Sequence, residues 1–177
     1  MTAEEIFDAV VYQLGIFQAI AETGGMRSNH VKPHGALYNM AARDETVADA
    51  VVRAVKAADS SLVLFAPDKS ALARAAEGLQ VNVAREVFAD RNYLSDGSLV
   101  PRGRPDALLH DPEVAADRVI RMLNEGRVQA TDGTDVAVRA ETICVHGDTP
   151  EAVEFVRALR SRLEKEGVEI ASPANSS

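Results

Sequence analysis

The sequence has 177 residues, a formal net charge of −8, 46% hydrophobic residues and 26% charged residues. This composition is typical of a globular chain rather than a disordered one, and the length suits a single domain over residues 1–177. The acidic excess disfavours nonspecific binding to nucleic acid or to an anionic membrane, because those partners repel a negative surface. No apolar run is long enough to cross a bilayer, and the N-terminus does not read as a signal peptide.

The single cysteine, Cys144, excludes an internal disulfide and gives no sign of an oxidising compartment. It stands in the apolar run 142–145, where a small thiol packs well in a core. We therefore expect an inert buried thiol in a cytoplasmic protein.

Helical and short apolar segments alternate along the first half of the chain. Thr2 and Glu5 form a capping box for a first helix, whose apolar residues recur at helical spacing up to Ala21 before Gly24 and Gly25 end it. The segments expected after it are a strand at 30–32, a helix at 44–58, a strand at 62–65, a helix at 69–77 and a strand at 81–87. Strands that alternate with helices predict a parallel sheet.

The second half begins with a long irregular stretch, residues 90–111, which is rich in Gly, Pro, Asp and Arg. A loop of this length in a compact domain is usually functional. Asp111 and Pro112 then predict the start of a helix that Gly126 ends, and Asp132-Gly133 predicts a hairpin within 128–138.

The last unit is a strand at 142–145 followed by a helix that Thr149 and Pro150 open and Gly167 ends. Residues 168–170 are expected to form a final strand. Four residues are expected on the apolar face of this helix: Val153, Val156, Leu159 and Leu163. The pattern predicts an α/β fold with a parallel sheet, and it does not separate an open sheet from a closed barrel.

Chemically useful side chains gather after predicted strands. Because the carboxyl ends of parallel strands lie at one edge, residues distant in sequence can meet there. In the first such segment, Lys32, His34, Tyr38 and Asn39 surround a sharp exit formed by Pro33 and glycine. The alternative for His34 is that it caps a helix or bonds to a backbone carbonyl.

The second segment places Glu86 and Asp90 on one side of a strand, next to Arg91. Two carboxylates beside a basic loop could act as acid and base, with pKa values pushed apart by their environments. The alternative is a surface ion pair between Asp90 and Arg91 with no catalytic role.

In the third segment, Arg102 and Arg104 could clamp a carboxylate or a phosphate, or could simply be solvated loop charges. In the fourth, His146 and Asp148 suit acid–base chemistry or metal ligation, although Asp148 could instead favour a helix dipole. The sequence contains no GxGxxG, Walker A, GxSxG, HExxH or CxxC motif.

Four stretches occur in the order and spacing of one family, and the similarity to that family extends from the first helix nearly to the last residue. They are HVKPHGALYN (His30–Asn39), REVFADRNY (Arg85–Tyr93), DGSLVPRGRP (Asp96–Pro105) and ICVHGDTPEAV (Ile143–Val153). On these motifs the sequence resembles the LamB/YcsF family.

The resemblance implies an irregular (β/α) TIM-like barrel, of which this sequence carries roughly the last two-thirds and lacks the first strands. It also implies ATP-dependent hydrolysis of 5-oxo-L-proline to L-glutamate, in a complex with two partner subunits. In the scheme that we infer, phosphorylation activates the lactam carbonyl, and water positioned by a carboxylate or a histidine then attacks it. ATP is expected as co-substrate, bound either here or by one of the partners, and no metal is predicted.

On the family's pattern six residues face the pocket: Lys32, His34, Glu86, Asp90, His146 and Asp148. Their division into two groups is our own inference. The catalytic candidates are His34, Glu86, Asp90, His146 and Asp148. The substrate-binding candidates are Lys32, Tyr38, Asn39, Arg91 and Arg102, with Arg102 expected to hold the substrate carboxylate.

Two other functions remain open from the residues alone. One is a metal-dependent hydrolase or deacetylase that uses His34, His146 and Asp148. The other is a non-catalytic fragment that binds partner subunits. The absence of the first strands, which the resemblance implies, would leave open sheet edges, and these predict self-association or partner binding.

Overall fold

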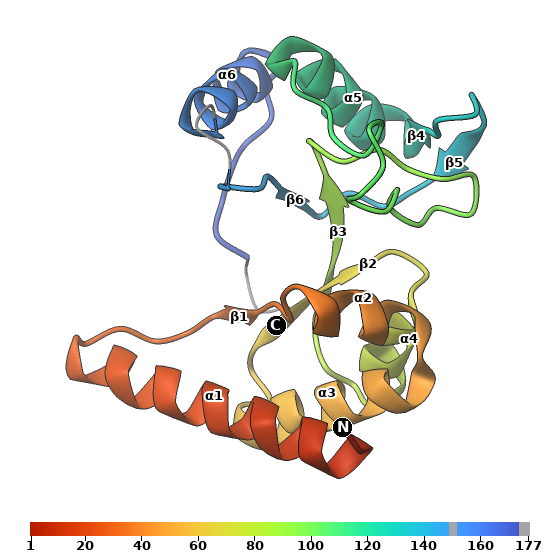
Figure 1. Cartoon of the computed structure of the whole chain (residues 1–177). Helices are drawn as coiled ribbons and strands as arrows, with labels where there is room; N and C mark the ends of the chain where they lie inside the picture. The colour runs from red at the N-terminus through yellow and green to blue at the C-terminus, as the bar shows by residue number, and fades with distance from the viewer. Residues whose placement is uncertain (149–151, 174–177) are drawn as a thin grey trace. The chain divides into compact units, whose positions relative to one another are not determined.

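A computed structural model describes residues 1–148 and 152–173 (Figure 1). The chain forms two compact units, Met1–Arg85 together with the tail from Ser172, and Glu86–Ala171. Strand hydrogen bonding follows the order β1-β2-β3-β6, and β3 (Val83–Phe88) begins in the first unit and ends in the second. The expectation of an α/β fold with parallel strands is confirmed.

The N-terminal unit contains four helices and a parallel strand pair. Its elements are α1 (Ala3–Thr23), β1 (His30–Val31), α2 (Ala36–Arg43), α3 (Glu45–Ala58), β2 (Val63–Pro67) and α4 (Ala71–Gly78). The predicted capping box of Thr2 and Glu5 is present at the start of α1. Helix α2 was not predicted, because it has only eight residues and follows Gly35 with no side-chain cap.

Helix α3 is the centre of this unit's apolar core. It contacts α1, α2 and α4, and most of its alanine and valine side chains are buried. Leu64 of β2 and Leu72 of α4 are fully buried in the same cluster. This packing holds β1 and β2 parallel, with Val31 opposite Leu64.

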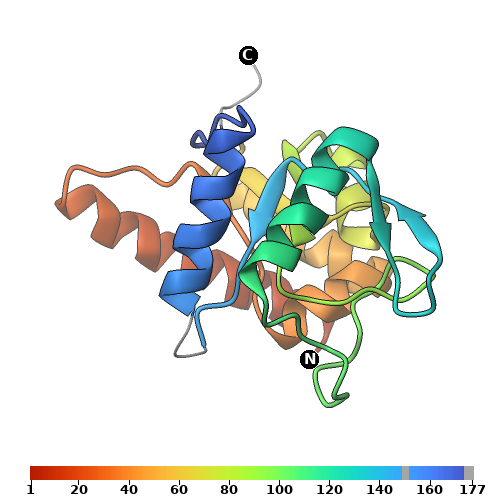
Figure 2. The same ribbon diagram turned by 90° about the horizontal axis from the view of Figure 1, so that it is seen from above.

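The C-terminal unit contains the end of β3, a long irregular stretch and five further elements. These are α5 (Pro112–Glu125), β4 (Arg127–Gln129), β5 (Asp135–Ala137), β6 (Thr142–Cys144) and α6 (Ala152–Lys165). The predicted Asp111 cap, the first-turn proline and the hairpin are all confirmed. Helices α5 and α6 pack against each other (Figures 1 and 2).

Strand β6 runs parallel to β3, with Glu86 opposite Thr142 and Phe88 opposite Cys144. One further backbone bond, from Ala89 N–H to the Cys144 carbonyl, continues the ladder past the end of β3. The residues that follow the two strands are therefore held at one edge of the sheet.

Two expectations for the end of the chain are wrong. Helix α6 buries Phe155 with Leu159 and Leu163, whereas Val153 and Val156 are exposed. The reason is that Phe155 belongs to an equally regular helical stripe and brings more apolar area to the core. Residues 168–170 form no strand, and Thr149 and Pro150 lie outside the described residues.

The end of α5 gives a test of the fold. Gly126 closes this helix in the left-handed region, at φ 64°, and its backbone bonds to Met122 and Val138. We expect Gly126→Ala to lower the free energy of unfolding by about 1–2 kcal/mol, because a Cβ strains that conformation. Gly103→Ala is the matched control, since Gly103 has no positive φ and open space around it. If denaturant titrations gave equal losses of unfolding free energy for the two variants, the left-handed conformation of Gly126 would be contradicted.

Candidate functional site

Asp90 and His146 form the central contact of the C-terminal unit. Asp90 follows β3 and His146 follows β6, so the parallel pairing brings them together. The His146 Nδ1 atom lies 2.9 Å and 3.1 Å from the two Asp90 carboxylate oxygens, and the His146 backbone N–H donates to the same carboxylate at 3.0 Å. The sequence predicted both residues, and the structure brings them together.

The electrostatics of this pair define the state of the imidazole. Burial raises the pKa of Asp90, but the hydrogen bonds and positive charge of His146 outweigh burial and hold that pKa below its usual value. An ionised carboxylate can only accept a hydrogen bond, so Nδ1 carries a proton, and a ring with a single proton then has its lone pair on Nε2. In the part of the chain that the structure describes, Nε2 has no hydrogen-bond partner. The Phe88 ring stacks on the imidazole at 5.8 Å and fixes its plane.

The pair borders a cavity of about 490 Å³. Its other lining residues are Leu108, Leu109, His110, Val145, Ala152 and Phe155. The walls are mostly apolar, with the acid–base pair as the main polar feature, which is typical of small-molecule sites. His110 was not predicted, although its position between the irregular stretch and the Asp111 cap was a usable signal.

Arg91 and Asp90 are both buried, so they do not form the exposed surface ion pair that the sequence left open. Asp90 is only 8% exposed and Arg91 only 7% exposed. The Arg91 guanidinium donates to the carbonyls of Val100 and Ala107, at 2.6 Å and 3.4 Å, and burial lowers its pKa. Arg91 therefore orders the irregular stretch, and its predicted contact with substrate stays a prediction.

Arg118 of α5 fixes the start of this stretch from the other side. It donates to the Arg91 carbonyl at 2.7 Å and to Asn92 Oδ1 at 2.5 Å. Tyr93 is buried, which raises its pKa, and its hydroxyl accepts from the Phe88 N–H at 2.8 Å. These contacts hold the segment after β3 in one conformation.

Glu86, the other predicted carboxylate of β3, is buried in the strand. It lies four residues before Asp90 and opposite Thr142. Its predicted acid–base role stays a prediction.

Arg102 and Asp148 form an exposed ion pair. The Arg102 Nη1 atom lies 2.8 Å from Asp148 Oδ2, and this hydrogen bond lowers the pKa of Asp148. Arg104 instead bonds to Asp106, two residues along the same loop. Arg102 thus reaches the segment that contains His146, whereas Arg104 is tied within its own loop.

The remaining predicted residues belong to the N-terminal unit, and they are Lys32, His34, Tyr38 and Asn39. Gly35 has φ 60°, which confirms the sharp exit, and α2 begins after it without a cap from exposed His34. Lys32 Nζ lies 5.3 Å from the centre of the buried Tyr38 ring. Asn39 Nδ2 donates to the Gly35 carbonyl at 3.0 Å.

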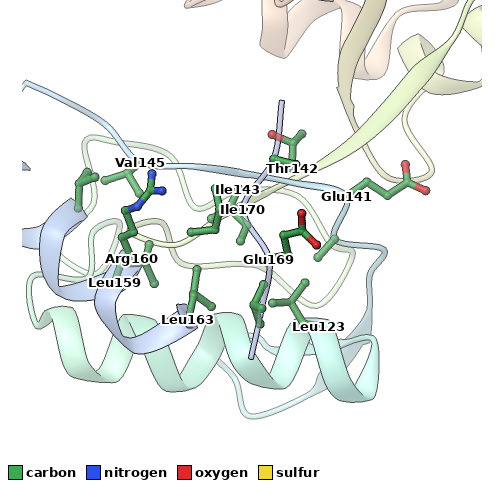
Figure 3. Close-up of a pocket in the computed structure, with 14 residues that line it drawn as sticks. Leu123, Glu141, Thr142, Ile143, Val145, Leu159, Arg160, Leu163, Glu169 and Ile170 are labelled. Carbon is green, nitrogen blue, oxygen red and sulfur yellow. The ribbon is translucent and has the colours of Figure 1, made fainter. Parts of the chain in front are cut away.

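A second cavity of the C-terminal unit, about 350 Å³, lies among β6, α5, α6 and the segment after α6 (Figure 3). Its walls include the apolar side chains of Ile143, Leu159 and Leu163, with Glu141 and Arg160 among the polar residues. Arg160 bonds to Glu164 on the next turn of α6. None of the predicted site residues lines this cavity, which lies within the unit's apolar packing.

Within residues 1–148 and 152–173, no group of three or more His, Cys, Asp or Glu side chains is placed to hold a metal ion. No helix in these ranges has the length and apolar character needed to cross a membrane.

The structure is that of an α/β protein in which a carboxylate and an imidazole meet at the ends of parallel strands, beside a mostly apolar cavity. The model of the LamB/YcsF family matches residues 1–177, and the chain belongs to this family. The resemblance seen in the four sequence motifs is thereby confirmed.

Named relatives and a crystal structure agree with this assignment. The chain is 48% identical over 96% of its length to the A subunit of 5-oxoprolinase from Oceanobacillus iheyensis, and 44% identical over 97% to that from Bacillus subtilis. It also matches the crystal structure of a lactam utilization protein from Thermus thermophilus, with a TM-score of 0.89 and 44% identity over 96% of the chain. The matches cover 66%, 67% and 68% of these three chains, so this chain spans about two thirds of their length.

The lowered pKa of Asp90 gives a pH prediction. A carboxyl whose folded-state pKa lies below its unfolded value adds stability above the unfolded pKa of about 4, and loses it as pH falls through the folded pKa. We expect Asp90→Asn to lower the free energy of unfolding by about 1–3 kcal/mol near neutral pH, and by progressively less in acid.

Urea titrations from pH 7 down to pH 3 measure this difference, with Asp68→Asn as control. The structure gives the Asp68 side chain no hydrogen bond or ion pair among the described residues. The Asp68→Asn variant should therefore change the free energy of unfolding little at any pH. If the difference in unfolding free energy between wild type and Asp90→Asn stayed constant over this range, the ionised Asp90 carboxylate would not be the source of the stabilisation.

Proposed function

We propose that this chain acts in the hydrolysis of 5-oxo-L-proline to L-glutamate, as the A subunit of an ATP-dependent 5-oxoprolinase. The observation that carries the proposal is the Asp90–His146 pair beside an apolar cavity. Membership of the LamB/YcsF family and the names of the relatives support the choice of a cyclic amide as substrate.

In the proposed mechanism His146 is the general base and later the general acid. Its Nε2 atom takes a proton from water as the water oxygen attacks the ring carbonyl carbon. The ring C–N bond then breaks, and the leaving nitrogen receives that proton from the imidazolium. Asp90 holds the Nδ1 tautomer and stabilises the imidazolium without exchanging a proton itself.

The cavity walls and the neighbouring loop fit the ring methylenes and the carboxylate of such a substrate. The ring methylenes of 5-oxoproline would lie against Leu109 and Phe155. Arg102 would bind the substrate carboxylate by exchanging one carboxylate partner, Asp148, for another. Asp148 would thus keep the guanidinium in position before substrate arrives.

ATP remains a proposed co-substrate. We derive no step for ATP at the residues that line this cavity. We propose that the chain acts in a complex with two partner subunits and that ATP binds within this complex. The names of the relatives denote one subunit of an enzyme, which supports a multi-subunit assembly.

The test of the base is His146→Gln, assayed by the release of labelled glutamate from labelled 5-oxo-L-proline with ATP and both partner subunits. We expect kcat to fall about 10²–10⁴-fold, because the proton acceptor is lost. His30→Gln is the control, since His30 stacks on Phe65 in β2 and was never a candidate site residue. If His146→Gln kept wild-type turnover, His146 would not be the base.

The test of carboxylate binding compares Arg102→Gln with Arg104→Gln. Both arginines are half exposed, lie in one loop and pair with an aspartate, but only Arg102 reaches the segment after β6. We expect Arg102→Gln to raise the KM for 5-oxo-L-proline at least about tenfold with a smaller change in kcat, and Arg104→Gln to change neither. The proposed role of Arg102 would be wrong if the two variants had equal KM values.

A further inference from the structure

His110 is a second imidazole in the cavity that Asp90 and His146 border. It lies at the end of the irregular stretch, directly before the Asp111 cap of α5. His110 is exposed as well as lining the cavity, so it lies where the cavity opens to solvent. The proposed mechanism uses the imidazole of His146 and gives His110 no role.

The backbone on both sides of His110 is fixed. On one side, the Leu109 N–H donates to the Asp90 carbonyl at 2.9 Å. On the other, the Asp111 carboxylate accepts two hydrogen bonds, at 2.9 Å and 3.3 Å, from N–H groups in the first turn of α5. The bond from Leu109 ties this segment to the residue that holds His146. His110 therefore has a set place relative to the Asp90–His146 pair.

The hydrolysis of an amide benefits from a hydrogen-bond donor at the carbonyl oxygen as well as from a base. Negative charge develops on that oxygen when water attacks the carbonyl carbon, and a donor placed there stabilises the charge. Among the cavity residues that the structure describes, the leucine, valine, alanine and phenylalanine side chains have no donor. The ionised Asp90 carboxylate can only accept.

The donors of His146 are already engaged. Its Nδ1–H and its backbone N–H both bond to the Asp90 carboxylate, and its Nε2 atom is the proposed proton acceptor. The His110 ring always keeps an N–H, because a neutral imidazole is protonated on one nitrogen and an imidazolium on both. Within residues 1–148 and 152–173, the His110 ring has no hydrogen-bond partner. Among the described side chains of the cavity, the donor left for a ligand is therefore that of His110.

We propose that His110 donates a hydrogen bond from its ring to the lactam carbonyl oxygen of 5-oxo-L-proline and stabilises the charge that forms there when water attacks. This inference rests on the proposed function, because that function supplies the substrate. The two imidazoles then have different roles, since His146 transfers the proton and His110 binds the oxygen. The bond strengthens as charge develops, so its loss should lower kcat more than it raises KM.

The test compares two substitutions of His110 in the complete enzyme, with ATP and both partner subunits. His110→Phe keeps a ring at this position but removes every ring N–H, and we expect kcat for 5-oxo-L-proline to fall about 10²–10³-fold with a smaller change in KM. His110→Gln keeps an amide N–H and should retain a kcat within about tenfold of wild type.

His30→Phe is the matched control, since it also replaces an exposed imidazole by a phenyl ring, but in the other unit. It should leave kcat and KM unchanged. Thermal melts confirm that the variants fold.

A binding measurement separates this inference from the proposed function. Nuclear magnetic resonance of the histidine rings in the full chain compares 5-oxo-L-proline with L-proline, which has the ring and the carboxylate but no ring carbonyl. We expect only 5-oxo-L-proline to shift the ring signals of His110, which are identified by their absence from the spectrum of His110→Phe.

The inference is overturned, and the proposed function stands, if the His110→Phe enzyme turns over 5-oxo-L-proline as wild type does or loses no more activity than His110→Gln. If the complex with the wild-type chain hydrolyses no 5-oxo-L-proline, the proposed function fails and the ring signals decide. A shift with 5-oxo-L-proline alone then supports the contact of His110 with the carbonyl, and equal or absent shifts overturn it.

Discussion

The parallel pairing of β3 with β6 is the constraint on which the candidate site depends. The ladder runs from Glu86 opposite Thr142 to Phe88 opposite Cys144, and the bond from Ala89 to Cys144 extends it. Asp90 and His146, which are 56 residues apart, then meet because each leaves the same edge of the same sheet. The backbone N–H of His146 donates to the Asp90 side chain, so the site begins where the ladder ends.

This junction determines the chemistry of the imidazole. A carboxylate in a partly dry environment normally has a raised pKa, but here two hydrogen bonds from one residue reverse the direction. The ionised carboxylate fixes the tautomer and the Phe88 ring fixes the plane, so the basic nitrogen is presented in one orientation. Such preorganisation is what the general base in the proposed mechanism requires.

The long irregular stretch after β3 keeps its conformation through one buried and one half-buried cation, Arg91 and Arg118. Arg91 and Arg118 lose hydration, which lowers the pKa of each, but their guanidiniums bond to carbonyls and to an amide of the stretch. These bonds satisfy backbone groups that have no strand or helix partner. A segment without regular structure can in this way form one wall of the cavity, through Leu108 and Leu109.

The sequence by itself determined the elements with strong local signals. The capping box at Thr2, the cap at Asp111, the Gly126 stop and the Asp132-Gly133 hairpin all depend on residues within a few positions of one another, and all were found. Local patterns also located Asp90 and His146 after strands, and four motifs indicated the family. Helix α2 was missed because it lacks a side-chain cap, and the buried face of α6 was misjudged because two regular stripes compete on it.

Only the tertiary structure decided which partner each polar group takes. Asp90 is adjacent in sequence to Arg91, yet it bonds to His146, and Arg91 is buried among distant carbonyls. The same holds for Arg102 and Arg104, which look alike in sequence but pair with a distant and a neighbouring aspartate, respectively. Pairing across a sheet depends on strand order and register, which are set by packing over the whole unit and leave no local pattern in the chain.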